Sequence, residues 1–393
     1  MPEPGLRAEA ELLLACARLE LSPVESGNFL RLVGAGLDWS MVLGLASRHG
    51  LRPLLYRHLD ALAPAAAPRP IFVELWGCHE SLARRNAAMA AELLCIVDAL
   101  EANAIPCLPY KGPALAQSAY GDLALREFGD LDILVAPADL MRARTLVQAL
   151  GYTSRYPLAP PQEAALLRSG MHYHLVLDRS AGEWMVELHW RTDPDYPVER
   201  CDDPQWWETR PRAALGAGRV RAFSTEELLL VLCLHGSKHF WTSLGWLVDV
   251  AEMIRREPRI DWAWIIAKVH DLAGRRRLAL GLGLAQRLLD APLPEEVAAY
   301  VRESRIGALA DGIVASLFTP RFQPPGAVAA LRLNLAMFER PAQRLAHCMN
   351  VVFSPTLVEW SRWPLPRPLF ILYLPLRIAR LTTKYLGRWL GRA

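Results

Sequence analysis

Two aspartates, Asp130 and Asp132, stand two residues apart in GDLDILVAP, residues 129–137, a segment that alternates as a half-buried strand does. Successive side chains of a strand point to opposite faces, so both carboxylates project from one face while Leu131 and Ile133 project from the other. Two like charges this close repel each other unless a cation lies between them. Mg²⁺, with Mn²⁺ as a possible substitute, prefers oxygen ligands and leaves positions open for water and phosphate. The pair therefore predicts a divalent metal site.

A lysine and a glycine, Lys111 and Gly112, follow directly after a predicted strand that starts at Ile105. A helical segment from Pro113 to Ala119 comes next, so the order is strand, tight turn and helix. Backbone N–H groups at such a turn can bind an anion, and glycine allows a close approach. We therefore expect Lys111 and Gly112 to contact phosphate groups.

A third carboxylate, Glu187, lies in a second alternating segment, residues 185–190, and shares a face with His189. The residues alone leave two interpretations open. Glu187 either completes the metal site or is an exposed strand carboxylate that pairs with an arginine. Imidazole suits softer metals than Mg²⁺, so we expect His189 to support a metal ligand or to contact a base.

A helix is predicted to begin at Ser224, because Ser-Thr-Glu-Glu is a capping box. His235, Lys238 and His239 follow at i, i+3 and i+4, on one face of this helix. That face fits contact with nucleotide phosphates, or else forms a polar stripe at a domain interface. A zinc site with Cys233 is rejected, because Cys233 lies two residues before His235 and points elsewhere on the helix.

Together these motifs resemble an uncharacterised bacterial nucleotidyltransferase family of the polymerase-β-like superfamily. The resemblance rests on Lys-Gly at a strand–helix turn, on an arginine shortly before D-x-D, on the strand E-L-H-W and on the pattern H-G-x-K-H…W…D. It covers roughly residues 100 to 260. The superfamily usually has Gly-Ser at the turn where this chain has Lys-Gly, a variant that the family itself carries.

The resemblance implies a role for each motif. Glu187 would join Asp130 and Asp132 as the third metal ligand and help to activate the acceptor hydroxyl. Arg126 would join Lys111 and Gly112 in holding the triphosphate. The helix residues would contact the nucleotide or the acceptor, and these are His235, Lys238, His239, Trp246 and Asp249.

Apolar residues at three-to-four spacing predict helices on both sides of these motifs. We expect an α+β fold whose small mixed sheet forms a nucleotidyltransferase core at residues 104–222. An N-terminal helical region, residues 1–103, and a C-terminal helical region, residues 223–393, would flank this core. A chain of 393 residues also exceeds the usual single domain.

The composition, 52% hydrophobic and 22% charged, is that of a folded globular protein. Seven scattered cysteines form no C-x-x-C pair, and acidic residues stand at the N-terminus where a signal peptide would be basic. We therefore expect the cysteines to be reduced core residues and the protein to be cytoplasmic. The sequence shows no P-loop and no basic-plus-aromatic module, so no specific nucleic acid partner is expected.

The C-terminal tail is basic, with no acidic residue after Glu359. Arg377, Arg380, Lys384 and Arg388 follow one helical face, and apolar residues follow another. Such a helix lies peripherally on the inner face of an anionic membrane, or it covers the protein's own core with its arginines solvated.

Three functions follow from these motifs. In the first, an enzyme uses Mg²⁺ to move a nucleoside monophosphate from ATP or another NTP to an acceptor, with release of pyrophosphate. The acceptor is a small molecule, a peptide, a lipid-linked sugar or a protein. In the second, D-x-D serves a glycosyltransferase, although such enzymes place alternating strands and helices before the motif. The third is a non-catalytic scaffold in a biosynthetic complex.

Overall fold

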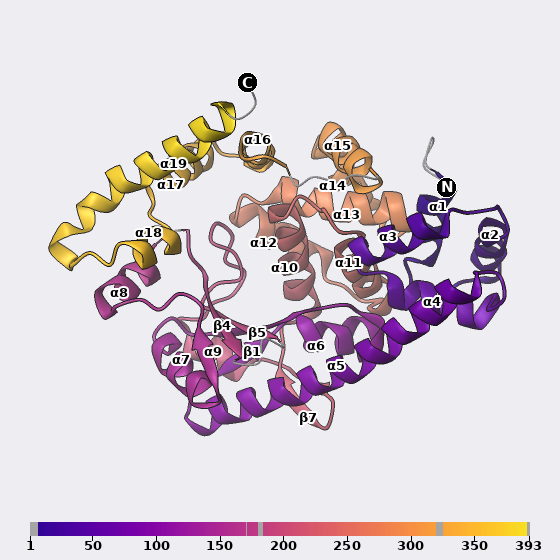
Figure 1. The fold of residues 1–393 in the computed structure, drawn as a ribbon, viewed down its shortest axis with the longest axis horizontal. Helices are drawn as coiled ribbons and strands as arrows, with labels where there is room; N and C mark the ends of the chain where they lie inside the picture. The colour runs from indigo at the N-terminus through magenta and orange to yellow at the C-terminus, as the bar shows by residue number, and fades with distance from the viewer. Residues whose placement is uncertain (1–6, 170, 180–183, 320–324, 391–393) are drawn as a thin grey trace.

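The computed structural model describes residues 7–169, 171–179, 184–319 and 325–390, in which helices surround one small sheet (Figure 1). Within these ranges five strands form the main sheet, in the order β1-β2-β5-β4-β3. The strands are β1 (Cys107–Pro109), β2 (Asp130–Val135), β3 (Tyr152–Ser154), β4 (His174–Arg179) and β5 (Met185–His189). β2 and β5 run parallel, whereas the other neighbouring pairs are antiparallel. The small mixed sheet and the α+β class are confirmed.

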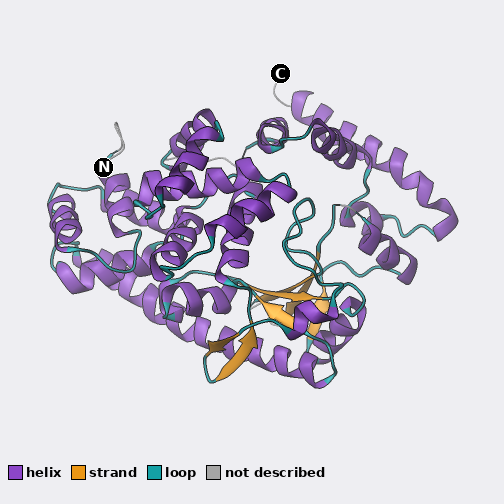
Figure 2. Cartoon of the chain, turned by 180° about the vertical axis from the view of Figure 1, so that it is seen from behind, coloured by secondary structure: helices purple, strands orange, loops and turns teal. Residues whose placement is uncertain are grey.

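One face of this sheet is covered by the long helix α5 (Arg69–Ala102), which runs along it in Figure 2. Leu131 and Ile133 of β2 are fully buried and share a core with Leu93 and Ile96 of α5. Because strand side chains alternate, Asp130 and Asp132 project from the opposite face. The apolar packing against α5 therefore decides which way the two carboxylates point.

The predicted N-terminal helices are present. They are α1 (Ala8–Cys16), α2 (Pro23–Val33), α3 (Trp39–His49) and α4 (Arg52–Leu62), followed by α5. Apolar side chains of α1–α4 form one core with helices from the second half of the chain, and this core also includes Leu108 of β1 and Leu134 of β2. His49 shows the link, since its Nδ1 accepts a hydrogen bond of 3.1 Å from the backbone N–H of Leu244.

The helices of the second half begin at Thr225, directly after the predicted capping box, which is formed by Ser224 and Glu227. They are α10 (Thr225–Lys238), α11 (Leu244–Arg256), α12 (Trp262–Asp271), α13 (Arg275–Leu289), α14 (Glu295–Glu303) and α15 (Gly307–Leu317). α10 is buried continuously along residues 227–234. Its C-terminal end is thereby held rigidly above the carboxylate face of the sheet (Figure 1).

Shorter elements connect the sheet to these helices. They are α6 (Gly112–Leu115), the π-helical turn η1 (Ala116–Tyr120), η2 (Leu123–Leu125), α7 (Leu140–Ala149), α8 (Pro160–Arg168), α9 (Pro204–Glu208), β6 (Arg212–Leu215) and β7 (Gly218–Arg221). All seven cysteines are free. Cys95 is exposed, so the prediction that the cysteines are core residues was wrong at this position.

The C-terminal arm, residues 327–390, contains α16 (Ala327–Met337), α17 (Pro341–Phe353), α18 (Leu357–Arg362), η3 (Arg367–Leu372) and α19 (Tyr373–Leu390). Arg377 is only 5% exposed, and both Arg377 and Arg380 pair with the buried carboxylate of Glu359. The expectation that the tail arginines are solvated was therefore wrong for Arg377, because the fold supplies a buried counter-charge. The side chains of Lys384 and Arg388 lie outside the described part. Among the described residues, no helix is long and apolar enough to cross a membrane.

Candidate active site

Three carboxylates meet on the face of the sheet that α5 leaves open. Asp130 and Asp132 come from β2 and Glu187 from β5, and the parallel register pairs Asp132 directly with Glu187. One carboxylate oxygen of each residue lies within 4.8 Å of the others. Alternation within each strand puts the side chains on one face, and the register brings the strands' acidic positions together. The alternative of Glu187 as an exposed carboxylate paired with an arginine does not agree with the structure, because its side chain is 20% exposed, lies beside the aspartates and contacts His189.

Lys111 and His189 stabilise these carboxylates by an ion pair and by hydrogen bonds. Lys111 Nζ lies 2.6 Å from Asp132 Oδ1, and His189 Nε2 lies 3.1 Å from the same oxygen and 3.2 Å from Glu187 Oε2. Burial alone would raise the pKa of Asp132, but Lys111 and His189 hold that pKa well below its usual range. His189 thus supports two of the carboxylates, as expected.

Asp130 has the opposite electrostatic environment. The negative charge of Asp132, followed by burial, raises the pKa of Asp130. In Glu187 burial also acts to raise the pKa, but the hydrogen bond from His189 outweighs it and the pKa is lowered. The site therefore holds more negative charge than its own cations balance at Asp130.

The donor set fits a hard divalent cation. It consists of carboxylate oxygens, and Asp132 Oδ2 is buried without a hydrogen-bond partner among the described residues. An oxygen left without a partner in a buried site is costly unless a ligand reaches it. Asp130, Asp132 and Glu187 therefore match the ligands that Mg²⁺ takes in proteins.

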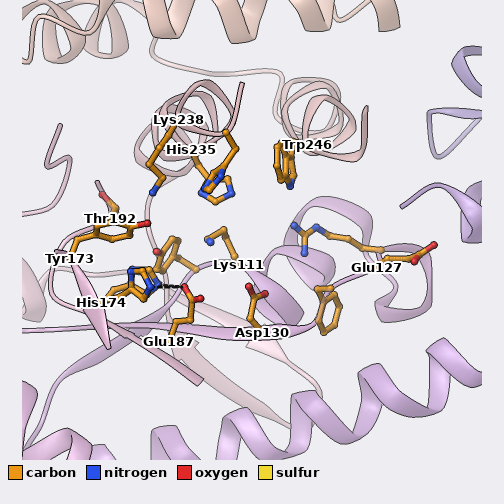
Figure 3. A pocket seen from close by; sticks show the side chains of 15 residues that line it. Lys111, Glu127, Asp130, Tyr173, His174, Glu187, Thr192, His235, Lys238 and Trp246 are labelled. Atoms are coloured by element: carbon orange, nitrogen blue, oxygen red, sulfur yellow. Dashed lines mark hydrogen bonds and ion pairs between the residues drawn. The ribbon is translucent and has the colours of Figure 1, made fainter. Parts of the chain in front are cut away.

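A cavity of about 400 Å³ separates these carboxylates from the end of α10 (Figure 3). His235, Lys238 and Trp246 face down into this cavity, and Asp130 and Glu187 face up from the sheet. Burial, with Lys111 as a further cause, lowers the pKa of His235 well below its usual value. Burial is also the main cause that lowers the pKa of Lys238 to about 8, against the opposing charge of Asp193. His235, Lys238 and Trp246 thus form the wall of the cavity that faces the carboxylates of the sheet.

Gly112 contributes to the site through packing. Its φ is +53°, and a Cβ atom there would lie 2.8 Å from the backbone oxygen of Asp130. Gly112 is buried and is not among the residues that line the cavity. The structure therefore explains the glycine by the close approach of the turn to β2, which positions Asp130 and Lys111.

Arg126 lines the cavity but already has a partner. Its Nε and Nη2 donate hydrogen bonds of 2.8 and 3.0 Å to Asp249, and the Tyr120 hydroxyl donates a third bond, of 2.7 Å, to the same carboxylate. The remaining nitrogen, Nη1, is buried without a partner in the described residues. Asp249, expected to contact ligand, is 2% exposed and does not line the cavity, so it instead orients Arg126.

Sequence reasoning missed several residues that line the cavity, among them Glu127, Phe128, Tyr173, His174 and Thr192. His174 pairs with His189 across β4 and β5. The alternation of residues 172–177 indicates that His174 lies in a strand. Only the register of the two strands, however, places His174 beside the carboxylates.

Cys233 is fully buried and is not among the lining residues, so the rejection of a zinc site with His235 and His239 agrees with the structure. Its sulfur lies near Gly281, on α13, where a Cβ atom would approach it to 2.7 Å. This cysteine therefore belongs to the packing between α10 and α13.

Comparison with protein families supplies the decisive observation. A family model described as an uncharacterised nucleotidyltransferase matches residues 35–290, about two thirds of the chain. The chain belongs to this uncharacterised nucleotidyltransferase family. The family match spans the helices from α3 to α13 and so includes both walls of the cavity. No curated protein and no solved structure matches the chain.

We predict that Gly112→Ala destabilises the protein by about 1–3 kcal/mol, because the left-handed backbone disfavours a side chain and the new methyl group meets the Asp130 carbonyl. The shift in the midpoint of urea unfolding measures this change. Gly44→Ala in α3 is the matched control, since a Cβ atom there meets nothing within 4 Å. Equal midpoints for the two variants would contradict the packing role of Gly112.

Proposed function

We propose that this protein is a Mg²⁺-dependent nucleotidyltransferase of the polymerase-β-like superfamily, which moves a nucleoside monophosphate from an NTP to an acceptor and releases pyrophosphate. The meeting of three carboxylates opposite a wall of basic side chains carries the proposal. An NTP with its metal ion needs both surfaces, because the ion binds the carboxylates and the phosphates bind the cations. Family membership supports the same class of reaction.

Asp130, Asp132 and Glu187 would hold Mg²⁺, with Mn²⁺ as a substitute. A bound ion of this kind neutralises the negative charge that develops on a transferred phosphoryl group. Lys238 and Arg126 Nη1 would bind the triphosphate from the other side, since both line the cavity. Lys111 would exchange its contact with Asp132 for a phosphate when the metal site is filled.

The transfer itself requires few reacting side chains. The acceptor oxygen bonds to the α-phosphorus, the bond from the α-phosphorus to the bridging oxygen breaks, and pyrophosphate leaves. The proton of the acceptor hydroxyl passes to Glu187, whose lowered pKa keeps it a carboxylate. Most of the catalysis then comes from positioning and charge, which agrees with a site that is rich in carboxylates.

Two alternatives remain distinct from this proposal. A D-x-D glycosyltransferase would place alternating strands and helices before the motif, whereas the described chain before β1 is helical, α1 to α5. A non-catalytic scaffold on this fold would release no pyrophosphate from any NTP. Both alternatives are tested by the choice of ligand in the following experiment.

We predict that the protein with Mg²⁺ and one of the four common NTPs releases pyrophosphate and adds a nucleotide mass to an acceptor or to itself. Asp130→Asn and Asp132→Asn should each lower Mg²⁺-NTP affinity at least tenfold, because the ion loses a charged ligand. The measurements are pyrophosphate release, mass spectrometry and calorimetry.

The control for these variants is Asp311→Asn, which changes an exposed aspartate on α15. Unchanged NTP affinity in both site variants would rule out the proposed metal site. Release of phosphate, or stabilisation by UDP-sugars and not by NTPs, would instead indicate a kinase-like enzyme or a glycosyltransferase.

We also predict that NTP affinity falls as the pH rises through about 8. Lys238 is charged below this pKa and neutral above it, so its attraction for phosphate is present at lower pH and lost at higher pH. Lys238→Arg keeps its charge throughout this range and should remove the dependence. Calorimetry of the wild-type protein and of Lys238→Arg at pH values around 8 measures this pH dependence of NTP affinity. Identical pH profiles would show that Lys238 does not contact the phosphates.

The C-terminal arm supports a proposal about location. We propose that the turn at η3 makes peripheral contact with the anionic inner face of a membrane, in an otherwise cytoplasmic protein. Leu369, Ile371 and Leu372 are exposed there, Ile371 at 73%, and the exposed Arg362 and Arg367 lie beside them in the chain. Apolar side chains with neighbouring arginines match a bilayer surface that carries negative charge.

We predict that the protein floats with vesicles that contain phosphatidylglycerol and not with vesicles of phosphatidylcholine alone. Ile371→Asp should lower the membrane partition coefficient at least tenfold, because burying an isoleucine side chain contributes about 1.5–3 kcal/mol. Val328→Asp on α16 is the matched control, since Val328 is 64% exposed and lies outside the turn. Equal flotation of both variants would refute the contact.

A further inference from the structure

A second group of ligand atoms lies beside the acidic site. It consists of His174 on β4 with Glu187 and His189 on β5, and one ligand atom of each lies within 4.8 Å of the others. The two imidazole rings are stacked, with centroids 5.0 Å apart and planes inclined by 29°. This group shares only Glu187 with the three carboxylates described above.

The strand register creates this group. His174 pairs with His189 between β4 and β5, while Glu187 pairs with Asp132 between β5 and β2. Glu187 and His189 are two residues apart and therefore share a face. Glu187 thus stands between Asp130 on one side and His174 on the other (Figure 3), while His189, on the same strand as Glu187, contacts both Glu187 and Asp132.

The distances suit a shared ion. Glu187 Oε2 lies 3.2 Å from His189 Nε2 and 3.9 Å from His174 Nε2. Ligand atoms bonded to one ion at about 2.0–2.2 Å are separated by roughly 3 to 3.5 Å, so a small movement of His174 completes the geometry. The second of these distances is too long for a hydrogen bond.

The histidines also carry nitrogen atoms that the protein does not use. His189 is 2% exposed, and its Nδ1 and that of His174 are buried without partners in the described part of the chain. A metal-bound imidazole keeps its proton on the second nitrogen, so coordination through Nε2 would leave Nδ1 as the N–H group. Metal-bound histidines usually donate this N–H group to an acceptor, so the proposal rests on the positions of the Nε2 and Oε2 atoms and not on Nδ1.

We propose that His174, His189 and Glu187 form a second metal position, which takes a divalent first-row transition ion such as Zn²⁺ or Mn²⁺. Two imidazoles and one carboxylate are ligands of these ions, whereas Mg²⁺ prefers oxygen alone. Because Glu187 has two oxygens, it can bridge this ion and an ion held by the aspartates. This proposal concerns metal binding alone and does not depend on the transfer reaction.

The test is metal titration of the full chain without any nucleotide. Calorimetry with Zn²⁺ gives the affinity, and pulsed electron paramagnetic resonance of bound Mn²⁺ detects nitrogen ligands directly. We expect the wild-type protein to show nitrogen coupling to Mn²⁺. His174→Ala should weaken Zn²⁺ binding at least tenfold and reduce the nitrogen coupling, because one of three protein ligands is lost.

Two control variants separate this position from its neighbours. Asp130→Asn changes a residue that belongs only to the acidic site and should keep the nitrogen coupling. His172→Ala removes a nearby histidine that packs on Trp360, and it should leave Zn²⁺ affinity unchanged. Circular dichroism establishes that each variant is folded.

Mn²⁺ bound to Asp130→Asn, in which the acidic site is weakened, without nitrogen coupling would overturn the proposal, and so would equal Zn²⁺ affinity in wild type and His174→Ala. Equal loss in His172→Ala and His174→Ala would likewise remove the assignment to His174. A protein that binds Zn²⁺ as expected but releases no pyrophosphate from any NTP would refute the proposed transfer reaction and leave the second metal position intact.

Discussion

The parallel pairing of β2 with β5 is the constraint on which the candidate active site depends, because it sets Asp132 opposite Glu187. Neighbouring strands lie about 4.8 Å apart, so acidic side chains on one face at the same register must meet. Buried carboxylates that meet are costly unless they are compensated. Lys111 from the preceding turn and His189 from β5 supply that compensation at Asp132. Apolar packing of Leu131 and Ile133 against α5 holds the pair in this orientation.

The wall of the cavity opposite the carboxylates, formed by the end of α10, is rigid for a different reason. Residues 227–234 of α10 are all buried, so the helix end that carries His235 and Lys238 has little freedom to move. Burial lowers the pKa of both groups, so His235 is neutral at neutral pH and Lys238 is the cation of the two that faces the acids. A ligand that brings both phosphates and a metal ion satisfies the two walls at once. This complementarity, within a nucleotidyltransferase family, is what connects the fold to nucleotide chemistry.

Much of the fold was predictable because its signals are local. The alternation of apolar and acidic residues predicted the strand at Asp130 and the side chains on each of its faces. Apolar residues at three-to-four spacing predicted the helices, and the capping box at Ser224 predicted where α10 begins. The wall residues of α10 were predicted by the same means, because i, i+3 and i+4 positions share a face. His174 and Thr192 were missed, since nothing near them in the chain indicates which strand or loop lies beside the carboxylates. Cys95 was misplaced because an apolar run does not reveal which of its positions turns to solvent.

The sequence by itself determined which segments form helices and strands, and on which face of each element the acidic or basic side chains stand. It also determined the chemistry that those side chains favour. These properties depend only on a residue and its near neighbours in the chain. Only the tertiary structure decided which faces meet. It turned Arg377 inward onto Glu359, made Asp249 a partner of Arg126, and packed Gly112 under the Asp130 carbonyl. It also placed Glu187 between two aspartates and two histidines. Such pairings join residues far apart in the chain. The free energy of burying one group against another depends on the folded arrangement, so it cannot be predicted from a local sequence pattern.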